Sequence, residues 1–171
     1  VEVRIAGIEC HGPRGFVYVH GSHLVAHSPC RTTEAMSAIM KVYISVDIEG
    51  VAGITHWDEA SKTHADYPEF REQMTREAVA AIEGARAAGA TDVLVKDAHS
   101  SGRNLITAML PEDVRLIRSW AGHPLCMVQE LDESFDAVLM IGYHSAAGSE
   151  ANSLAHTLSL DAVEIRINGQ R

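Results

Sequence analysis

The chain has 171 residues, of which 46% are hydrophobic and 22% charged, a balance that is ordinary for one globular domain. Its formal net charge of -9 argues against nucleic-acid or anionic-membrane partners, because both need clustered Lys and Arg side chains. No apolar run approaches the roughly 20 residues of a membrane span. The three cysteines are odd in number and far apart, so a disulfide framework is disfavoured and a cytoplasmic location fits best.

Residues 1–39 differ in character from the rest of the chain. They hold four of the ten histidines and two of the three cysteines, and their glycines and prolines follow no period. One short strand is predicted around Phe16–His20. A zinc site is disfavoured here because only the His23/His27 pair has the spacing of structural zinc ligands. We therefore predict that residues 1–39 are a disordered or non-native extension and that the folded part begins at Met40.

From Met40 onward, strands and helices are predicted to alternate. Lys41–Val46 is rich in β-forming residues that alternate in polarity, which predicts a buried first strand. Pro68–Ala88 predicts an amphipathic helix with Pro68 in its first turn and Gly89 at its end. Its apolar face is formed by Phe70, Met74, Ala78, Ala81 and Ile82. The other predicted elements are strands at 92–96, 114–117, 137–141 and 163–168 and short helices at 104–110 and 127–131.

Strands separated by helices predict an α/β fold with a mostly parallel sheet and flanking helices. In such open sheets, ligands bind beyond the carboxyl ends of the strands. Asp47 and Glu49 follow the first strand, His99 follows the second, and His144 follows the strand at 137–141. The sequence therefore predicts two carboxylates and two imidazoles at one edge of the sheet.

These side chains have the chemistry of zinc ligands. Asp47 and Glu49 are two residues apart, so in an extended segment both lie on one face. Carboxylates held that close repel each other unless protons or a cation intervene, and two imidazoles complete a zinc-binding set. Asp97, two residues before His99, could hold one imidazole in its tautomer. From the pattern alone, a metal site and a set of solvated loop residues are equally good interpretations.

His156 lies twelve residues after His144, in a loop rich in Gly, Ala and Ser. By itself it is more typical of a hydrogen-bonded surface histidine. Beside a metal ion it could act as a nucleophile or as a proton shuttle. His64 and His123 have no supporting pattern and are predicted to be loop histidines.

Four motifs resemble those of the D-aminopeptidase family. They are Met40–Gly53 with its Ser-x-Asp-x-Glu-Gly signature, Val93–Ser100, Ile141–His144 and the Ala-His pair at 155–156. They occur in order at matching spacings, so the resemblance covers residues 40–171 and does not cover residues 1–39.

The resemblance implies a dinuclear zinc centre. Asp47, Glu49, His99 and His144 match the metal ligands of the family, with Asp47 bridging two Zn²⁺ ions, and His156 matches its catalytic nucleophile. Paired ions would polarise the scissile carbonyl, and a water at the ions is the alternative attacking group. The resemblance also implies a cytoplasmic, homo-oligomeric enzyme that releases N-terminal D-amino acids from short peptides.

Family members are about twice as long as residues 40–171, and a further glutamate ligand is expected beyond Arg171. We therefore expect residues 40–171 to be the N-terminal, metal-binding part of the domain, truncated before its C-terminal region and inactive or weak by itself. Two alternatives remain open: another metal-dependent amidohydrolase or phosphoesterase, or a non-catalytic α/β binding module. A nucleotide-binding module and a serine hydrolase are disfavoured because their motifs are absent.

Overall fold

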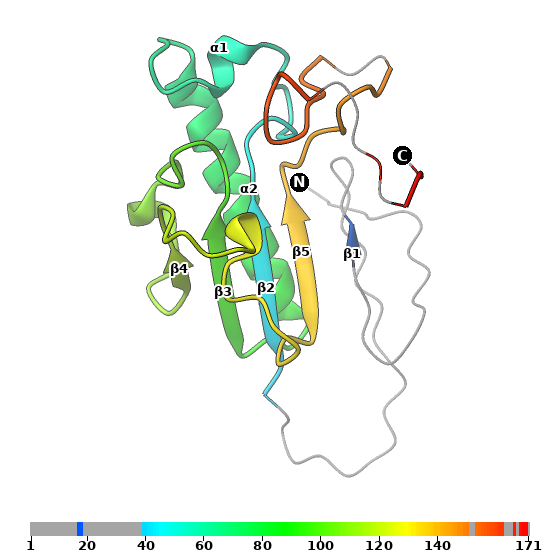
Figure 1. Cartoon of the computed structure of the whole chain (residues 1–171). Helices are drawn as coiled ribbons and strands as arrows, with labels where there is room; N and C mark the ends of the chain where they lie inside the picture. Colours follow the sequence, from blue (N-terminus) through cyan, green and yellow to red (C-terminus); the bar gives the residue numbers. More distant parts are fainter. Residues whose placement is uncertain (1–16, 19–38, 151–152, 163–165, 167, 171) are drawn as a thin grey trace.

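The computed structural model of the chain describes residues 17–18, 39–150, 153–162, 166 and 168–170. Within them, five strands form one sheet in the order β1-β5-β2-β3-β4, and every pairing is parallel (Figure 1). The strands are β1 (Val17–Tyr18), β2 (Lys41–Val46), β3 (Asp92–Asp97), β4 (Arg115–Ile117) and β5 (Ala137–Ile141). The helices are α1 (Trp57–Ala60) and α2 (Tyr67–Ala87), with 3₁₀ turns η1 (Thr107–Met109) and η2 (Cys126–Val128). None of these helices has both the length and the apolarity to cross a membrane.

The predicted α/β fold with a mostly parallel sheet is confirmed. The strands at 41–46 and 137–141 have the predicted bounds, and the long helix begins and ends one residue before its predicted limits. The two predicted short helices are reduced to the 3₁₀ turns η1 and η2. The predicted short strand near residue 17 is present as β1, paired with β5, while the other residues of 1–38 lie outside the described part. Most of the predicted strand at 163–168 also lies outside it.

The two faces of the sheet are covered by different kinds of structure. Val42, Ile44 and Val46 point to one face, where the apolar side of α2 packs against them. Because side chains alternate along a strand, Tyr43 and Ser45 point to the other face. There the segment around η2 covers the sheet, and Tyr43 packs with Phe135 in an edge-to-face contact. The helical layer is thus apolar, and the opposite layer mixes apolar and polar contacts.

The strand order creates a switch point at β2. The chain runs from β2 to β3 and β4 on one side and then returns to add β5 on the other side. Loops that leave the carboxyl ends of neighbouring strands on both sides of such a point enclose a crevice. In Figure 1, α1 and the segment after β5 gather at this end of the sheet.

Two glycines allow the loops after β2 and β5 to touch. Gly50 N donates a hydrogen bond to Gly142 O at 2.7 Å. A Cβ on Gly50 would lie 2.2 Å from Tyr143 O, and one on Gly142 would lie 2.3 Å from Asp47 O. Gly142 also has a φ of +65°, in the left-handed region that favours glycine. Neither position can carry a side chain without moving the backbone of the other loop.

Gly142→Ala should therefore destabilise the protein by more than about 2 kcal/mol, since backbone strain and a backbone clash add. Gly122→Ala is the matched control: its φ is +73°, but nothing lies within 4 Å of the added Cβ. It should cost only about 1 kcal/mol, the strain of the left-handed conformation. Urea unfolding measures both free energies. Equal costs would show that the close approach of the two loops contributes nothing.

Candidate metal centre

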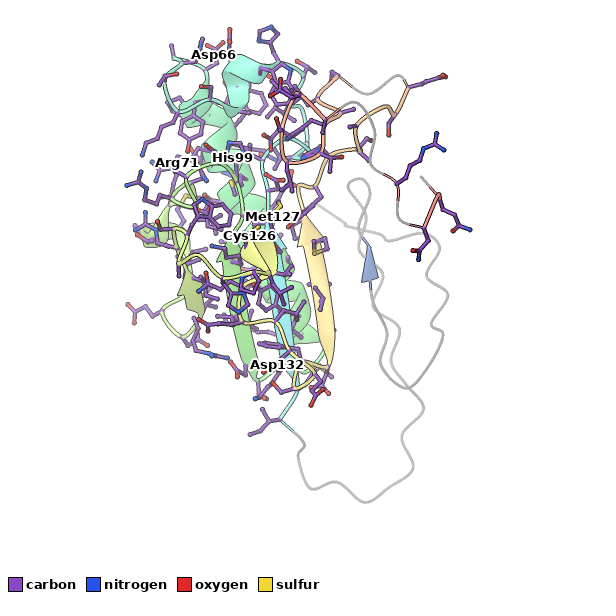
Figure 2. All side chains as sticks on the ribbon, viewed as in Figure 1. Asp66, Arg71, His99, Cys126, Met127 and Asp132 are labelled. Atoms are coloured by element: carbon purple, nitrogen blue, oxygen red, sulfur yellow. The ribbon has the colours of Figure 1, made fainter. Side chains whose placement is uncertain are left out.

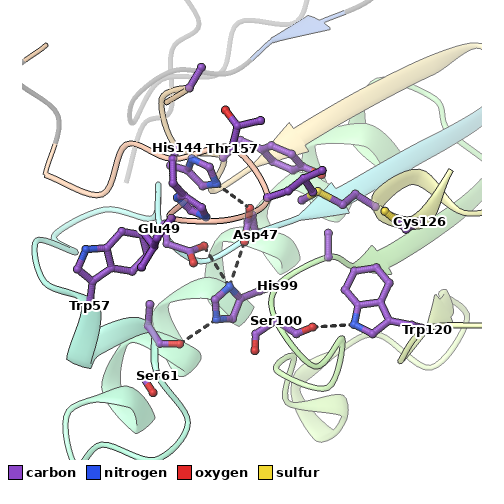
Figure 3. Close-up of a pocket in the computed structure, with 18 residues that line it drawn as sticks. Asp47, Glu49, Trp57, Ser61, His99, Ser100, Trp120, Cys126, His144 and Thr157 are labelled. Carbon is purple, nitrogen blue, oxygen red and sulfur yellow. Dashed lines mark hydrogen bonds and ion pairs between the residues drawn. The ribbon is translucent and has the colours of Figure 1, made fainter. Parts of the chain in front are cut away.

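The structure brings the four sequence-predicted metal ligands together at the switch point. Asp47 and Glu49 follow β2, His99 follows β3 and His144 follows β5 (Figure 3), and Figure 2 shows where His99 lies in the whole molecule. Glu49 lies in a turn, so the two carboxylates converge through a bend and not through the extended segment expected from their spacing. Asp47, Glu49 and His99 are all buried, with ligand atoms within 4.8 Å of one another.

Asp47 stands between the two imidazoles. Its Oδ1 lies 3.3 Å from His99 Nδ1, and its Oδ2 lies 3.6 Å from His144 Nε2. His99 Nδ1 is also 3.0 Å from Glu49 Oε2. Each oxygen of Asp47 thus faces a different imidazole nitrogen.

Backbone carbonyls hold both imidazoles in defined tautomers. His99 Nε2 lies 2.8 Å from Ala60 O, and His144 Nδ1 lies 2.9 Å from Ser145 O. A carbonyl oxygen only accepts hydrogen bonds, so each of these nitrogens donates. In the neutral imidazole the remaining nitrogen then carries the lone pair, and it is the nitrogen that faces Asp47.

The buried cluster retains protons. Burial raises the pKa of Asp47 above its ordinary value, although hydrogen bonding with His99 works against it. Burial would also raise the pKa of Glu49, but hydrogen bonds with His99 and Asp47 hold it below its ordinary value. Burial would lower the pKa of His99, yet the two carboxylates beside it raise that pKa. A divalent cation would displace these protons, so metal affinity should fall as the pH falls.

His156 lies against His144. The two rings stack with centroids 3.6 Å apart, and Trp57 makes an edge-to-face contact with His156 at 5.0 Å between centroids. His156 Nδ1 lies 2.9 Å from Leu154 O and therefore donates to it. Its Nε2 is left as the nitrogen that can exchange a proton or attack a carbonyl. Burial lowers the pKa of His144, and the nearby His156 lowers it further. The His144 ring that stacks on His156 is therefore neutral near pH 7.

Within the described part of the chain, Asp97 makes no hydrogen bond or ion pair with an imidazole, which corrects the role suggested for it. Its carboxylate accepts hydrogen bonds from Asn104 N at 2.5 Å, Asn104 Nδ2 at 2.8 Å and Leu105 N at 2.7 Å. Asn104 Nδ2 also donates to His99 O at 2.6 Å, and its Oδ1 accepts from Tyr67 at 2.7 Å. Asp97 therefore supports the backbone after His99 through Asn104.

The four predicted ligands and His156 line a cavity of about 670 Å³. Both tryptophans of the chain, Trp57 and Trp120, line it, from opposite sides of the carboxylates in Figure 3. Neither tryptophan could be recognised from the sequence pattern, because each stands in a short segment without periodicity. Trp57 lies in α1, a four-residue helix too short for a periodic pattern. The one available sequence sign of its start was Glu59, three residues after His56, whose carboxylate accepts from His56 N in the structure.

The sequence profile of the D-aminopeptidase family matches residues 40–171, and the chain belongs to this family. A D-aminopeptidase of Bacillus subtilis (strain 168) is 36% identical over 129 residues, which are 75% of this chain and 46% of that protein. The solved structure of DppA from Bacillus subtilis, described as a Zn-dependent D-aminopeptidase and a self-compartmentalizing protease, matches with a TM-score of 0.67 at 35% identity. That match covers 70% of this chain and 43% of DppA. The chain thus spans less than half the length of these relatives, and the family predicted from its motifs is confirmed.

Asn104→Asp should destabilise the fold by about 3 kcal/mol or more, because it removes two buried donors and places a second carboxylate against Asp97. Tyr67→Phe, which removes one donor to Asn104, should cost about 1 kcal/mol. Burial would raise the folded-state pKa of the new carboxyl, so the deficit of Asn104→Asp should shrink as the pH falls and grow as it rises. Urea unfolding between pH 5 and pH 8 measures this, and a deficit independent of pH would argue against the buried contact.

Proposed function

We propose that the protein to which this chain belongs is a zinc-dependent aminopeptidase that releases N-terminal D-amino acids from short peptides. One observation carries the proposal: Asp47 lies between two imidazoles, beside a second buried carboxylate, at the switch point of the sheet. Membership of the D-aminopeptidase family and the likeness to a Zn-dependent member support it.

The described residues fit zinc ions by the chemistry of their donors. Glu49 Oε2 is buried, and when His99 is neutral with its proton on Nε2 this oxygen has no hydrogen-bond donor within the described part of the chain, so a cation would satisfy it. We propose that Asp47, Glu49, His99 and His144 would hold two zinc ions, since each oxygen of Asp47 faces a different imidazole. The further glutamate ligand that the resemblance implies would lie beyond Arg171.

The ions would supply a Lewis acid that polarises the scissile carbonyl. We assign proton transfer to His156, because Leu154 O fixes its Nδ1 as a donor and leaves Nε2 to take and return a proton. His144 and Trp57 hold the ring from two sides, which limits its rotation. In hydrolysis, His156 would accept a proton from the attacking water and pass it to the leaving amine.

The composition of the cavity favours a peptide over a phosphate ester. Among the described residues that line it, none is Lys or Arg. Phosphate sites rely on such cations, or on metal ions together with them, to balance the charge of the ester. A neutral amide bond makes no such demand.

Three further properties are proposed for the complete protein. We expect it to be cytoplasmic, because three widely spaced cysteines disfavour a disulfide framework, and to be a homo-oligomer, because DppA is described as self-compartmentalizing. We also expect the 171-residue chain by itself to be weak or inactive, because it spans only 43–46% of its relatives. Peptidase assays of the chain and of a longer form test this, and full hydrolysis by the chain alone would contradict it.

The metal site is tested by zinc content after dialysis. The chain should retain zinc, and Asp47→Ala should lose it, because the carboxylate between the two imidazoles is removed. Asp113→Ala is the control: Asp113 pairs with Arg86 on the surface, and its loss should leave zinc content unchanged. Equal zinc in the chain and in Asp47→Ala would rule out this ligand set.

The role of His156 is tested in the protein that carries this chain. His156→Ala should lower kcat by about a hundredfold to ten-thousandfold, the range of proton-transfer catalysis, while zinc content stays the same. His64→Ala serves as the control, since His64 is an exposed histidine beside Asp58 that does not line the cavity. Unchanged kcat in His156→Ala would exclude it from the reaction.

A further inference from the structure

We propose that Trp120 forms the wall that receives the side chain of the first residue of the peptide, and that it favours a large apolar or aromatic side chain there. This inference rests on the proposed peptidase function and concerns the specificity of the same cavity. The evidence is the way Trp120 is held, the composition of the wall around it, and its position relative to His156.

Trp120 is fixed on two sides. Its Nε1 donates a hydrogen bond to Ser100 O at 2.6 Å. The ammonium of Lys96 lies 4.1 Å from the centroid of its ring and so covers one face of the indole. Lys96 is fully buried, with Nζ donating to Ser119 O at 2.6 Å. Trp120 is nevertheless 38% exposed, and the part of the indole that Lys96 does not cover lines the cavity.

The neighbouring wall is apolar and is held by the sheet. Cys126 and Met127 line the cavity beside Trp120. Ser45 Oγ lies 2.7 Å from Met127 O, which only accepts, so Ser45 donates to it. The hydroxyl of Tyr143, 2.7 Å from Ser45 Oγ, must then donate to Ser45. Because a chain of hydroxyls ties this wall to β2, it is preformed and not assembled by a ligand.

The position of His156 decides which part of the peptide meets this wall. Hydrolysis breaks the C–N bond, adds the hydroxyl of water to the carbonyl carbon and leaves a proton on the departing amine. His156 supplies that proton, so the departing part must extend toward His156 and Trp57. Figure 3 shows Trp57 and Trp120 on opposite sides of Asp47 and His99. The side chain of the first residue is therefore directed to the side of Trp120.

The same wall lies close to the bond that breaks. Trp120 is hydrogen-bonded to the backbone carbonyl of Ser100, the residue next to His99, and all three residues line the same cavity. A flat ring gains contact area and stacking energy on an indole that alanine cannot gain. An anionic side chain would lose hydration there without meeting an opposite charge, because no Lys or Arg is among the described lining residues.

The test compares kcat/KM for the tripeptides D-Phe-Gly-Gly and D-Ala-Gly-Gly in the zinc-loaded protein. The ratio of the two should exceed one and should fall about tenfold or more in Trp120→Ala, as expected for loss of one large apolar contact. In Lys96→Met, which keeps an apolar stem but removes the ammonium beneath the ring, the ratio should fall several-fold. Phe135→Leu, which alters an aromatic side chain of the same layer away from the cavity, should leave the ratio unchanged.

A second peptide pair separates the two sides of the cavity. The ratio for D-Ala-Phe-Gly over D-Ala-Gly-Gly should not change in Trp120→Ala, because the second residue lies on the side of Trp57. A change in this ratio, or an unchanged ratio for the first residue, overturns the proposal.

A binding measurement keeps the inference distinct from the proposed function. Trp57→Phe leaves Trp120 as the sole tryptophan of the chain, so its fluorescence reports contact with that wall. D-phenylalanine should quench it at a concentration about tenfold lower than D-alanine does, in keeping with the expected preference. If no peptide is hydrolysed but this difference is found, the peptidase assignment is wrong and the proposed role of Trp120 is supported. If peptides are hydrolysed and the two amino acids quench alike, the proposed role of Trp120 is wrong and the peptidase assignment is supported.

Discussion

The close approach of two backbone segments underlies the whole site. Beyond the ends of β2 and β5, hydrogen bonds continue from Asp47 N to Ile141 O at 2.8 Å and from Gly50 N to Gly142 O at 2.7 Å. These bonds keep the two loops together at the point where loops on an open sheet usually diverge. His144 therefore reaches the far oxygen of Asp47, and one carboxylate can serve both imidazoles. A sheet with side chains at the two glycine positions could keep its strands and lose this arrangement.

The two layers on the sheet have separate tasks. The layer of α2 is apolar and supplies the buried area that stabilises the fold. The opposite layer is attached by polar groups: Tyr43 donates to Gln129 O at 2.7 Å, Ser45 to Met127 O at 2.7 Å, and Lys96 to Ser119 O at 2.6 Å. Directed bonds of this kind fix where a segment lies more closely than apolar packing does, since they specify atom pairs. The wall of the cavity belongs to this second layer.

Much of the fold could be predicted from sequence, because its strands alternate in polarity and its long helix has a clear apolar face and end signals. The convergence of Asp47, Glu49, His99 and His144 followed from one rule, that loops at the carboxyl ends of parallel strands meet. The same reasoning could not predict α1, because a helix of four residues is too short to show a periodic pattern of apolar side chains. It also misjudged Asp97: nearness in sequence to His99 said nothing about the three donors around Asn104, which only the folded loop brings together. The tryptophan walls depend likewise on contacts between segments far apart in the chain.

The orientation of His99 depends on a main-chain atom of a very small helix. Ala60 O, which accepts from His99 Nε2, is the last carbonyl of α1. That helix has one turn, and its start is held by Glu59, which accepts from His56 N at 2.8 Å and Thr55 N at 2.7 Å. No substitution of a side chain can delete a carbonyl, but fraying of this turn would move it and free the ring to rotate. Local unfolding of four residues and cation affinity are therefore linked equilibria, so a bound ion should slow amide hydrogen exchange in α1, a segment that contributes no side-chain ligand.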